Sequence, residues 1–166
     1  TNDAEIAKKA RMLRDHGQSQ RYRHEILGYN YRMTNIAAAI GSVQLKKLEQ
    51  LNEGRINNAG YYNQNLNSKI QKPELIDGVK HVFHQYTIRV KDRRQFINYL
   101  EQKGVGYGIY YPIPIHKQPL FRECNDLNLP MAQEASEQVV SLPVHPSLTR
   151  EELEYIGKVV NSFESW

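Results

Sequence analysis

A stretch of helical periodicity between residues 36 and about 67 is the feature that most constrains the fold. The apolar residues that recur at helical spacing are Ile36, Ile40, Val43, Leu48 and Leu51. Thr34 or Asn35 can cap the start of this region. Gly54 and Gly60 weaken it, so we expect a kink or break near residues 50–54. The first part of the chain is therefore predicted to be helical.

A shorter helix is predicted before it, over residues 4–16. Asp3 is a suitable N-cap, and Gly17 follows as a C-terminal stop. Residues 18–33 lack periodicity and hold several basic and tyrosine side chains, which predicts an ordered loop. A loop of this length is usually functional or disordered, and its aromatic content argues against disorder.

Helical and strand patterns alternate in the second half of the chain. Strands are predicted at 81–90, 105–111 and 139–144, and helices at 92–103, at 131–138 and after Thr149. Pro112 and Pro114 exclude both helix and central strand between them. Thr149 and Glu152 match a capping box at the start of the last helix. The fold class is therefore predicted as α+β, with long helices and a small three-stranded sheet that is antiparallel or mixed.

Composition limits the classes of function. The chain has 166 residues and a net charge of +4, which is only weak support for nucleic-acid binding. No apolar run approaches the ~18 residues of a membrane span, and the polar N-terminus is not typical of a signal peptide. Cys124 is the only cysteine, which excludes an internal disulfide and a cysteine-based zinc site. We expect a cytoplasmic protein with no metal, no nucleic-acid partner and no membrane partner.

Two loops could carry chemistry. The turn Gly28–Thr34 precedes a helix and could offer backbone amides, the Asn30 amide and Arg32 to an anion. The loop Tyr110–His116 combines tyrosine faces, two prolines and His116, which could bind a phosphate or a hydroxyl. Each is also compatible with a purely structural turn, and on the residues alone the structural interpretation is favoured.

Three further sets of residues have side chains that could bind a ligand or a metal. A run of basic residues could bind a diphosphate, although such runs are usually solvated. The run consists of Arg14, Asp15, His16, Arg21, Arg23 and His24. His81 and His84 fall in a predicted strand at a spacing that places them on opposite faces, and His145 between two prolines is interpreted as structural. The histidines therefore do not predict a metal site.

Four segments, in order, resemble the DegT–DnrJ family of pyridoxal-phosphate (PLP) sugar aminotransferases. They are 1–17, Gly28–Thr34 with the helix that follows, Tyr111–His116, and Leu142–Pro146 with Leu148–Glu152. The resemblance covers almost the whole chain. It implies the small C-terminal domain of an aspartate-aminotransferase-type (fold type I) enzyme. Residues 1–67 would link a PLP-holding domain to a small α+β domain of residues 68–166.

The resemblance also implies partners and site residues. Family members are homodimers that transfer an amino group, commonly from glutamate, to a keto group of a nucleotide-linked sugar. The position of Asn30 contacts the PLP phosphate of the partner subunit, and Tyr111 and His116 lie near the sugar nucleotide. The Schiff-base lysine falls upstream of the position of Thr1, so no catalytic residue is predicted here and the chain is expected to be an inactive fragment. A PLP-dependent sugar dehydratase and a non-catalytic dimerisation or regulatory module remain alternatives.

Overall fold

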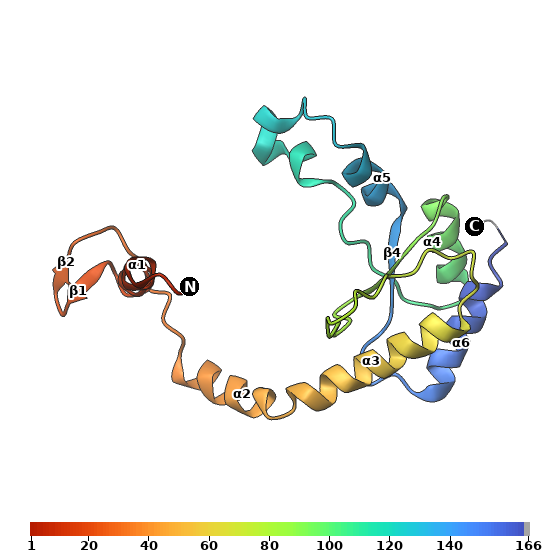
Figure 1. Cartoon of the computed structure of the whole chain (residues 1–166), viewed down its shortest axis with the longest axis horizontal. Coiled ribbons are helices and arrows are strands. Elements are labelled where there is room, and N and C mark those ends of the chain that lie inside the picture. Colours follow the sequence, from red (N-terminus) through yellow and green to blue (C-terminus); the bar gives the residue numbers. More distant parts are fainter. Residues whose placement is uncertain (165–166) are drawn as a thin grey trace. The chain divides into compact units, whose positions relative to one another are not determined.

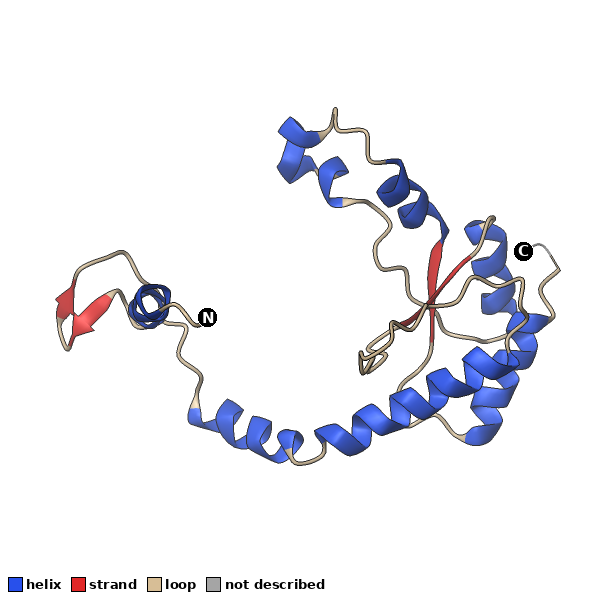
Figure 2. Ribbon diagram, in the orientation of Figure 1, coloured by secondary structure: helices blue, strands red, loops and turns tan. Residues whose placement is uncertain are grey.

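A computed structural model describes residues 1–164 of the chain, in two compact units that we call the N-terminal unit, Thr1–Leu48, and the C-terminal unit, Glu49–Trp166. The elements are labelled in Figure 1, and Figure 2 distinguishes helices from strands. The N-terminal unit contains α1 (Ala4–Arg14), β1 (Gln18–Gln20), β2 (Arg23–His24) and α2 (Asn35–Leu45). Then follow α3 (Leu48–Asn65), β3 (Tyr86–Arg89), α4 (Arg93–Gln102), the 3₁₀ helices η1 (Ile115–Lys117) and η2 (Pro119–Cys124), α5 (Pro130–Gln138), β4 (Val139–Leu142) and α6 (Arg150–Asn161).

The N-terminal unit begins with the predicted capped helix. The Asp3 carboxylate accepts hydrogen bonds from the backbone amides of Glu5 and Ile6, which confirms the predicted N-cap of α1. Thr34 caps α2 in the same way, by accepting a bond from the amide of Ala37. The predicted loop at 18–33 is wrong in one respect, because β1 and β2 pair there as a short antiparallel hairpin.

The long helical region is interrupted earlier than predicted. The break lies at residues 46–47, between α2 and α3, and not at 50–54. The amide of Lys47 bonds to the carbonyl of Gln44, a tighter i to i−3 contact that closes the last turn of α2. Gly54 instead lies inside α3, where a Cβ would approach the Pro146 side chain to 2.7 Å. This glycine therefore serves helix packing and not helix termination.

The C-terminal unit holds the hydrophobic core. Its buried residues come from α3, β3, α4, β4 and α6, and the fully buried large side chains include Tyr62, Tyr86, Ile88, Phe96 and Leu100. β3 and β4 pair antiparallel with Tyr86 opposite Leu142 and Arg89 opposite Val139. The predicted α+β class and the antiparallel pairing are confirmed.

The second predicted strand, 105–111, is wrong, and the first predicted strand is shorter than expected. Residues 105–111 contribute a single bridge, from Gly108 to Ser141, because Gly104, Gly106 and Gly108 weaken a strand. Strand β3 covers only the second half of 81–90. Phe83 has φ of 46°, a left-handed conformation that interrupts an extended chain, so His81 and His84 do not lie on opposite faces of a strand.

Side-chain hydrogen bonds join the helices to one another and to the sheet. Tyr62 of α3 donates to the Pro143 carbonyl at 2.8 Å, and Tyr86 of β3 donates to Asn63 at 2.7 Å. The Asn161 amide at the end of α6 donates to the Asn65 carbonyl of α3 at 2.8 Å. The Asn161–Asn65 bond joins α6 to α3, and the two helices lie side by side, as Figure 1 shows. In the described part of the chain, none of the helices has the length and apolar character needed to cross a membrane.

Replacing Thr149 by alanine should lower the free energy of unfolding by about 1 kcal/mol. Thr149 Oγ1 accepts from the Glu152 amide at 3.2 Å, and Glu152 Oε2 accepts from the Thr149 amide at 2.8 Å, so the predicted capping box is present. Urea unfolding followed by circular dichroism measures the change. The exposed Ser147 supplies the control, since Ser147→Ala leaves the cap intact. Equal effects of the two substitutions would show that the cap does not stabilise α6.

Candidate functional site

Asn30 lies on a segment that backbone hydrogen bonds fasten to the end of α1. The amide of Tyr29 donates to the Leu13 carbonyl at 2.8 Å, and the amide of Tyr31 donates to the Arg14 carbonyl at 2.9 Å. The amide of His16 returns a bond to the Tyr29 carbonyl at 2.9 Å. The position of Asn30 is therefore fixed by the backbone on either side of it, although its side chain is exposed.

The oxygen of the Asn30 side-chain amide is hydrogen-bonded within the described residues, whereas its nitrogen is not. Its Oδ1 accepts from Arg32 Nε at 3.3 Å, and the same Arg32 atom lies 3.3 Å from Asp15 Oδ1. Within residues 1–164 the Asn30 Nδ2 makes no hydrogen bond. An exposed amide donor beside a guanidinium is chemically suited to an anionic oxygen.

Two glycines close the base of the hairpin next to Asn30. Gly17 has φ of 71°, and a Cβ there would lie 1.7 Å from the Ile26 carbonyl oxygen. A Cβ on Gly28 would lie 2.0 Å from the Gly17 nitrogen. Only glycine permits this backbone contact. The hairpin with Arg21, Arg23 and His24 is thereby fixed to the segment that carries Asn30.

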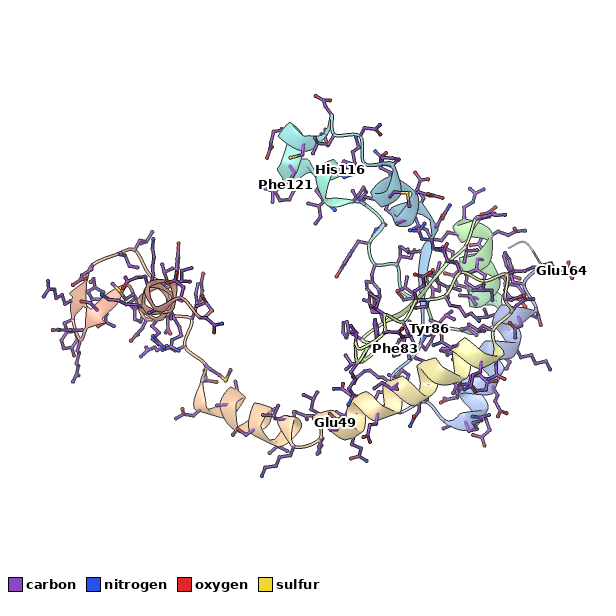
Figure 3. The ribbon with its side chains drawn as sticks, viewed as in Figure 1. Glu49, Phe83, Tyr86, His116, Phe121 and Glu164 are labelled. Atoms are coloured by element: carbon purple, nitrogen blue, oxygen red, sulfur yellow. The ribbon has the colours of Figure 1, made fainter. Side chains whose placement is uncertain are left out.

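Tyr111 and His116 line one cavity of about 790 Å³ in the C-terminal unit, which we call the His116 cavity. Its wall is mainly apolar and includes Ile113, Phe121, Leu127, Leu129 and Val139. Figure 3 labels His116 on η1 and Phe121 on the neighbouring η2. Tyr111 is 71% exposed, whereas His116 is only 6% exposed. The structure thus brings two predicted residues together, and Asn30 belongs to the other unit.

The His116 imidazole has an unused polar atom. Its Nε2 is buried and has no hydrogen-bond partner within the described residues. A buried polar atom without a partner costs about 1–3 kcal/mol, so such atoms are rare unless a ligand or water satisfies them. A ligand with a hydroxyl or phosphate group in this cavity could supply the missing bond.

A second hollow of about 480 Å³ combines Tyr110, from the predicted Tyr110–His116 loop, with polar residues for which the sequence predicted no binding role. We call it the Arg55 hollow, because it contains Arg55 of α3 together with His84, Gln85, Tyr110 and His145. These residues come from four separate segments. No local pattern in the sequence could have identified the cluster, because only the packing of α3 against the sheet brings the segments together.

Known proteins match the chain along nearly its whole length. The model of the DegT/DnrJ/EryC1/StrS aminotransferase family matches residues 1–161. The chain is 39% identical over 161 residues to UDP-N-acetyl-3-dehydro-alpha-D-glucosamine 3-aminotransferase of Acidithiobacillus ferrooxidans, which covers 96% of this chain and 44% of that protein. It is 37% identical over 169 residues to the "Pleiotropic regulatory protein" of Geobacillus stearothermophilus, covering 98% and 45%.

A solved structure agrees with the sequence matches. The fold is similar to that of NtdA from Bacillus subtilis, which was crystallised with bound cofactor PMP. The TM-score is 0.86 at 33% identity, and the match covers 96% of this chain and 40% of that one. The chain thus spans less than half the length of these relatives, and the resemblance predicted from its sequence is confirmed.

Proposed function

Because this chain belongs to the DegT/DnrJ/EryC1/StrS aminotransferase family, we propose that it is the C-terminal part of a PLP-dependent aminotransferase acting on nucleotide-linked keto sugars. A relative named as a UDP-sugar 3-aminotransferase supports the substrate class. The products would enter amino-sugar or cell-surface polysaccharide biosynthesis. Residues 1–67 would link the PLP-holding domain to the small domain of residues 68–166. The fragment would be inactive alone, because its sequence contains no lysine that matches the family's catalytic position.

The cofactor would be held in part by Asn30. When bound, PLP supplies an electron sink that stabilises charge next to the transferred nitrogen. The exposed Asn30 Nδ2 fits the role of a hydrogen-bond donor to the PLP phosphate of the partner subunit. Backbone bonds on both sides of Asn30 orient the donor before the phosphate arrives, which lowers the entropic cost of binding.

The sugar nucleotide would bind in the His116 cavity, and the buried, unpartnered Nε2 of His116 is the observation that carries this assignment. His116 would bond a phosphate or sugar oxygen, since imidazole can donate or accept there. Tyr111, exposed at the same cavity, would offer its ring and hydroxyl to the ligand. The apolar wall would exclude water from these bonds and so strengthen them.

Replacing His116 by glutamine should weaken binding of UDP-N-acetylglucosamine to the chain about tenfold, which corresponds to about 1.4 kcal/mol. The loss of one well-placed hydrogen bond is of this size. Amide chemical shifts of the cavity residues, followed by NMR during titration, measure the affinity. His81→Gln is the matched control, because His81 is exposed and absent from the cavity wall. If the wild-type chain shows no shifts at the cavity, or if both variants bind alike, the assignment is wrong.

The complete enzyme would be a cytoplasmic homo-oligomer, most simply a homodimer, with an acidic amino donor and no nucleic-acid or membrane partner. Every residue of α2 is exposed on the chain by itself, although this helix is rich in alanine and isoleucine. A helix that is apolar on all sides is normally buried. Burial of α2 against the rest of the enzyme and against a second subunit would account for this composition.

A regulatory module is the second candidate function. One relative, 37% identical, is named for pleiotropic regulation and not for catalysis. In that case the His116 cavity would still bind a sugar nucleotide as a signal, but the longer protein that contains this chain would show no transamination. Measuring amino transfer by that longer protein distinguishes the two.

A further inference from the structure

The Arg55 hollow gathers cationic and hydrogen-bonding side chains without an acidic residue. Arg55, His84 and His145 line it together with Gln85, Tyr107 and Tyr110, and no Asp or Glu of the described chain is among its lining residues. The Tyr107 hydroxyl is already used, because it donates a hydrogen bond to Glu101 at 2.7 Å. The chemistry of this lining favours an anion.

The walls of the hollow are held in place by contacts outside it. Tyr62 donates to the Pro143 carbonyl at 2.8 Å, and Asn58 Nδ2 donates to the His145 carbonyl at 2.9 Å, so the segment after β4 is tied to α3. Gly108 exchanges two backbone bonds with Ser141, at 3.0 and 2.8 Å. Phe83 and Tyr86, labelled in Figure 3, are buried on either side of His84 and Gln85. The hollow is therefore preformed.

Arg55 carries a charge that no carboxylate neutralises. Its Nη1 makes two long bonds within α3, to the Leu51 carbonyl at 3.3 Å and to Asn52 Oδ1 at 3.4 Å. Among residues 1–164, Arg55 forms no ion pair, and its Nε and Nη2 atoms make no hydrogen bond. A half-buried guanidinium with a free edge can bind a carboxylate through two parallel hydrogen bonds.

The hollow adjoins the His116 cavity, because Tyr110 lines both. A Cβ on residue 108 would lie only 2.4 Å from the Tyr110 ring. The glycine at this position therefore leaves room for Tyr110 in the wall that the two sites share. An aminotransferase must accept its amino donor and its keto sugar in turn at one cofactor. Two adjacent subsites of different chemistry, one cationic and one largely apolar, suit two such substrates.

We propose that the Arg55 hollow binds a carboxylate group of the amino donor and of its keto-acid product, an inference that rests on the proposed function. Arg55 binds the carboxylate through its free edge, and His84 and His145 donate hydrogen bonds to the same group. One guanidinium matches the single charge of a carboxylate better than the charge of a diphosphate.

Titration of the chain with 2-oxoglutarate tests this subsite. We expect the imidazole resonances of His84 and His145 and the Nε resonance of Arg55 to shift, and Arg55→Gln to weaken binding at least tenfold. Arg94→Gln is the matched control, because Arg94 is exposed on α4 and absent from the hollow. If Arg55→Gln fails to fold, His84→Gln serves in its place and should weaken binding about threefold or more.

Two further titrations separate this proposal from its rivals. If inorganic phosphate or UDP shifts the same resonances with equal or higher affinity, the hollow is a phosphate site and the carboxylate assignment is wrong. If 2-oxoglutarate leaves the hollow unchanged while UDP-N-acetylglucosamine still binds in a manner that depends on His116, the subsite fails and the proposed function stands. If neither ligand binds, both fail.

Discussion

Replacing Phe96 by alanine should lower the free energy of unfolding of the C-terminal unit by about 3–5 kcal/mol. Phe96 of α4 is 0% exposed, and its ring packs edge-on against Phe163 with ring centres 5.0 Å apart. Removing the ring leaves a cavity in addition to the lost apolar burial, and both terms destabilise the fold. Domains are typically stable by only about 5–15 kcal/mol, so this one change removes a large share.

Urea unfolding followed by circular dichroism measures this loss, and NMR locates it. Asn98→Ala on the same helix is the control, since Asn98 is exposed and its change should stay within about 0.5 kcal/mol. Amide signals of the N-terminal unit should report no comparable change, because that unit has no large apolar side chain among the buried core residues. A Phe96→Ala chain as stable as Asn98→Ala would contradict the described core.

High pH should destabilise the C-terminal unit through two buried tyrosines. Burial raises the pKa of Tyr62 and of Tyr86 above the ordinary value of about 10, because the phenolate is poorly solvated inside the core. The unfolded chain releases these protons near pH 10, whereas the folded chain retains them. Stability is therefore complete below about pH 10 and falls above it, by about 1.4 kcal/mol per pH unit for each retained proton.

Two variants assign the pH dependence to these residues. Above pH 10, Tyr62→Phe and Tyr86→Phe should each reduce the slope of the unfolding free energy against pH by the contribution of one proton, about 1.4 kcal/mol per pH unit. At neutral pH each substitution should lower the free energy of unfolding by about 1 kcal/mol, because the Pro143 carbonyl or the Asn63 side chain loses its hydrogen-bond donor. Tyr155→Phe is the control. Its exposed hydroxyl donates to the Lys103 carbonyl at 2.9 Å, so the variant also loses a bond but should keep the wild-type slope. An unchanged slope in the Tyr62 and Tyr86 variants would refute the explanation.

Features set by neighbouring residues were predicted well from the sequence. The caps Asp3, Thr34 and Thr149 are confirmed, since a side chain that bonds an amide two or three residues away leaves a short, recognisable pattern. Leu153, Ile156 and Val160 recur at helical spacing in the sequence, and they form the buried face of α6. In these cases the physical cause lies within a few residues along the chain.

Features that depend on distant partners were predicted poorly. The strand expected at 105–111 is only one bridge, and the kink expected at Gly54 is a packing contact with Pro146. In both places a glycine has a role that its neighbours in the sequence do not reveal. The site residues divide in the same way. The motif loops pointed to Tyr111 and His116, which line one cavity, whereas the Arg55 hollow left no trace in any single segment.

The sequence by itself determined the class of fold, the caps, the apolar stripes and the family, because each is encoded in local spacing or in motif order. Only the tertiary structure decided that His116 has a buried nitrogen without a partner and that Arg55, His84 and His145 face one hollow. Burial and convergence are properties of packing between distant segments. A polar residue in a sequence therefore shows what chemistry it can perform, and the fold decides what it is left free to bind.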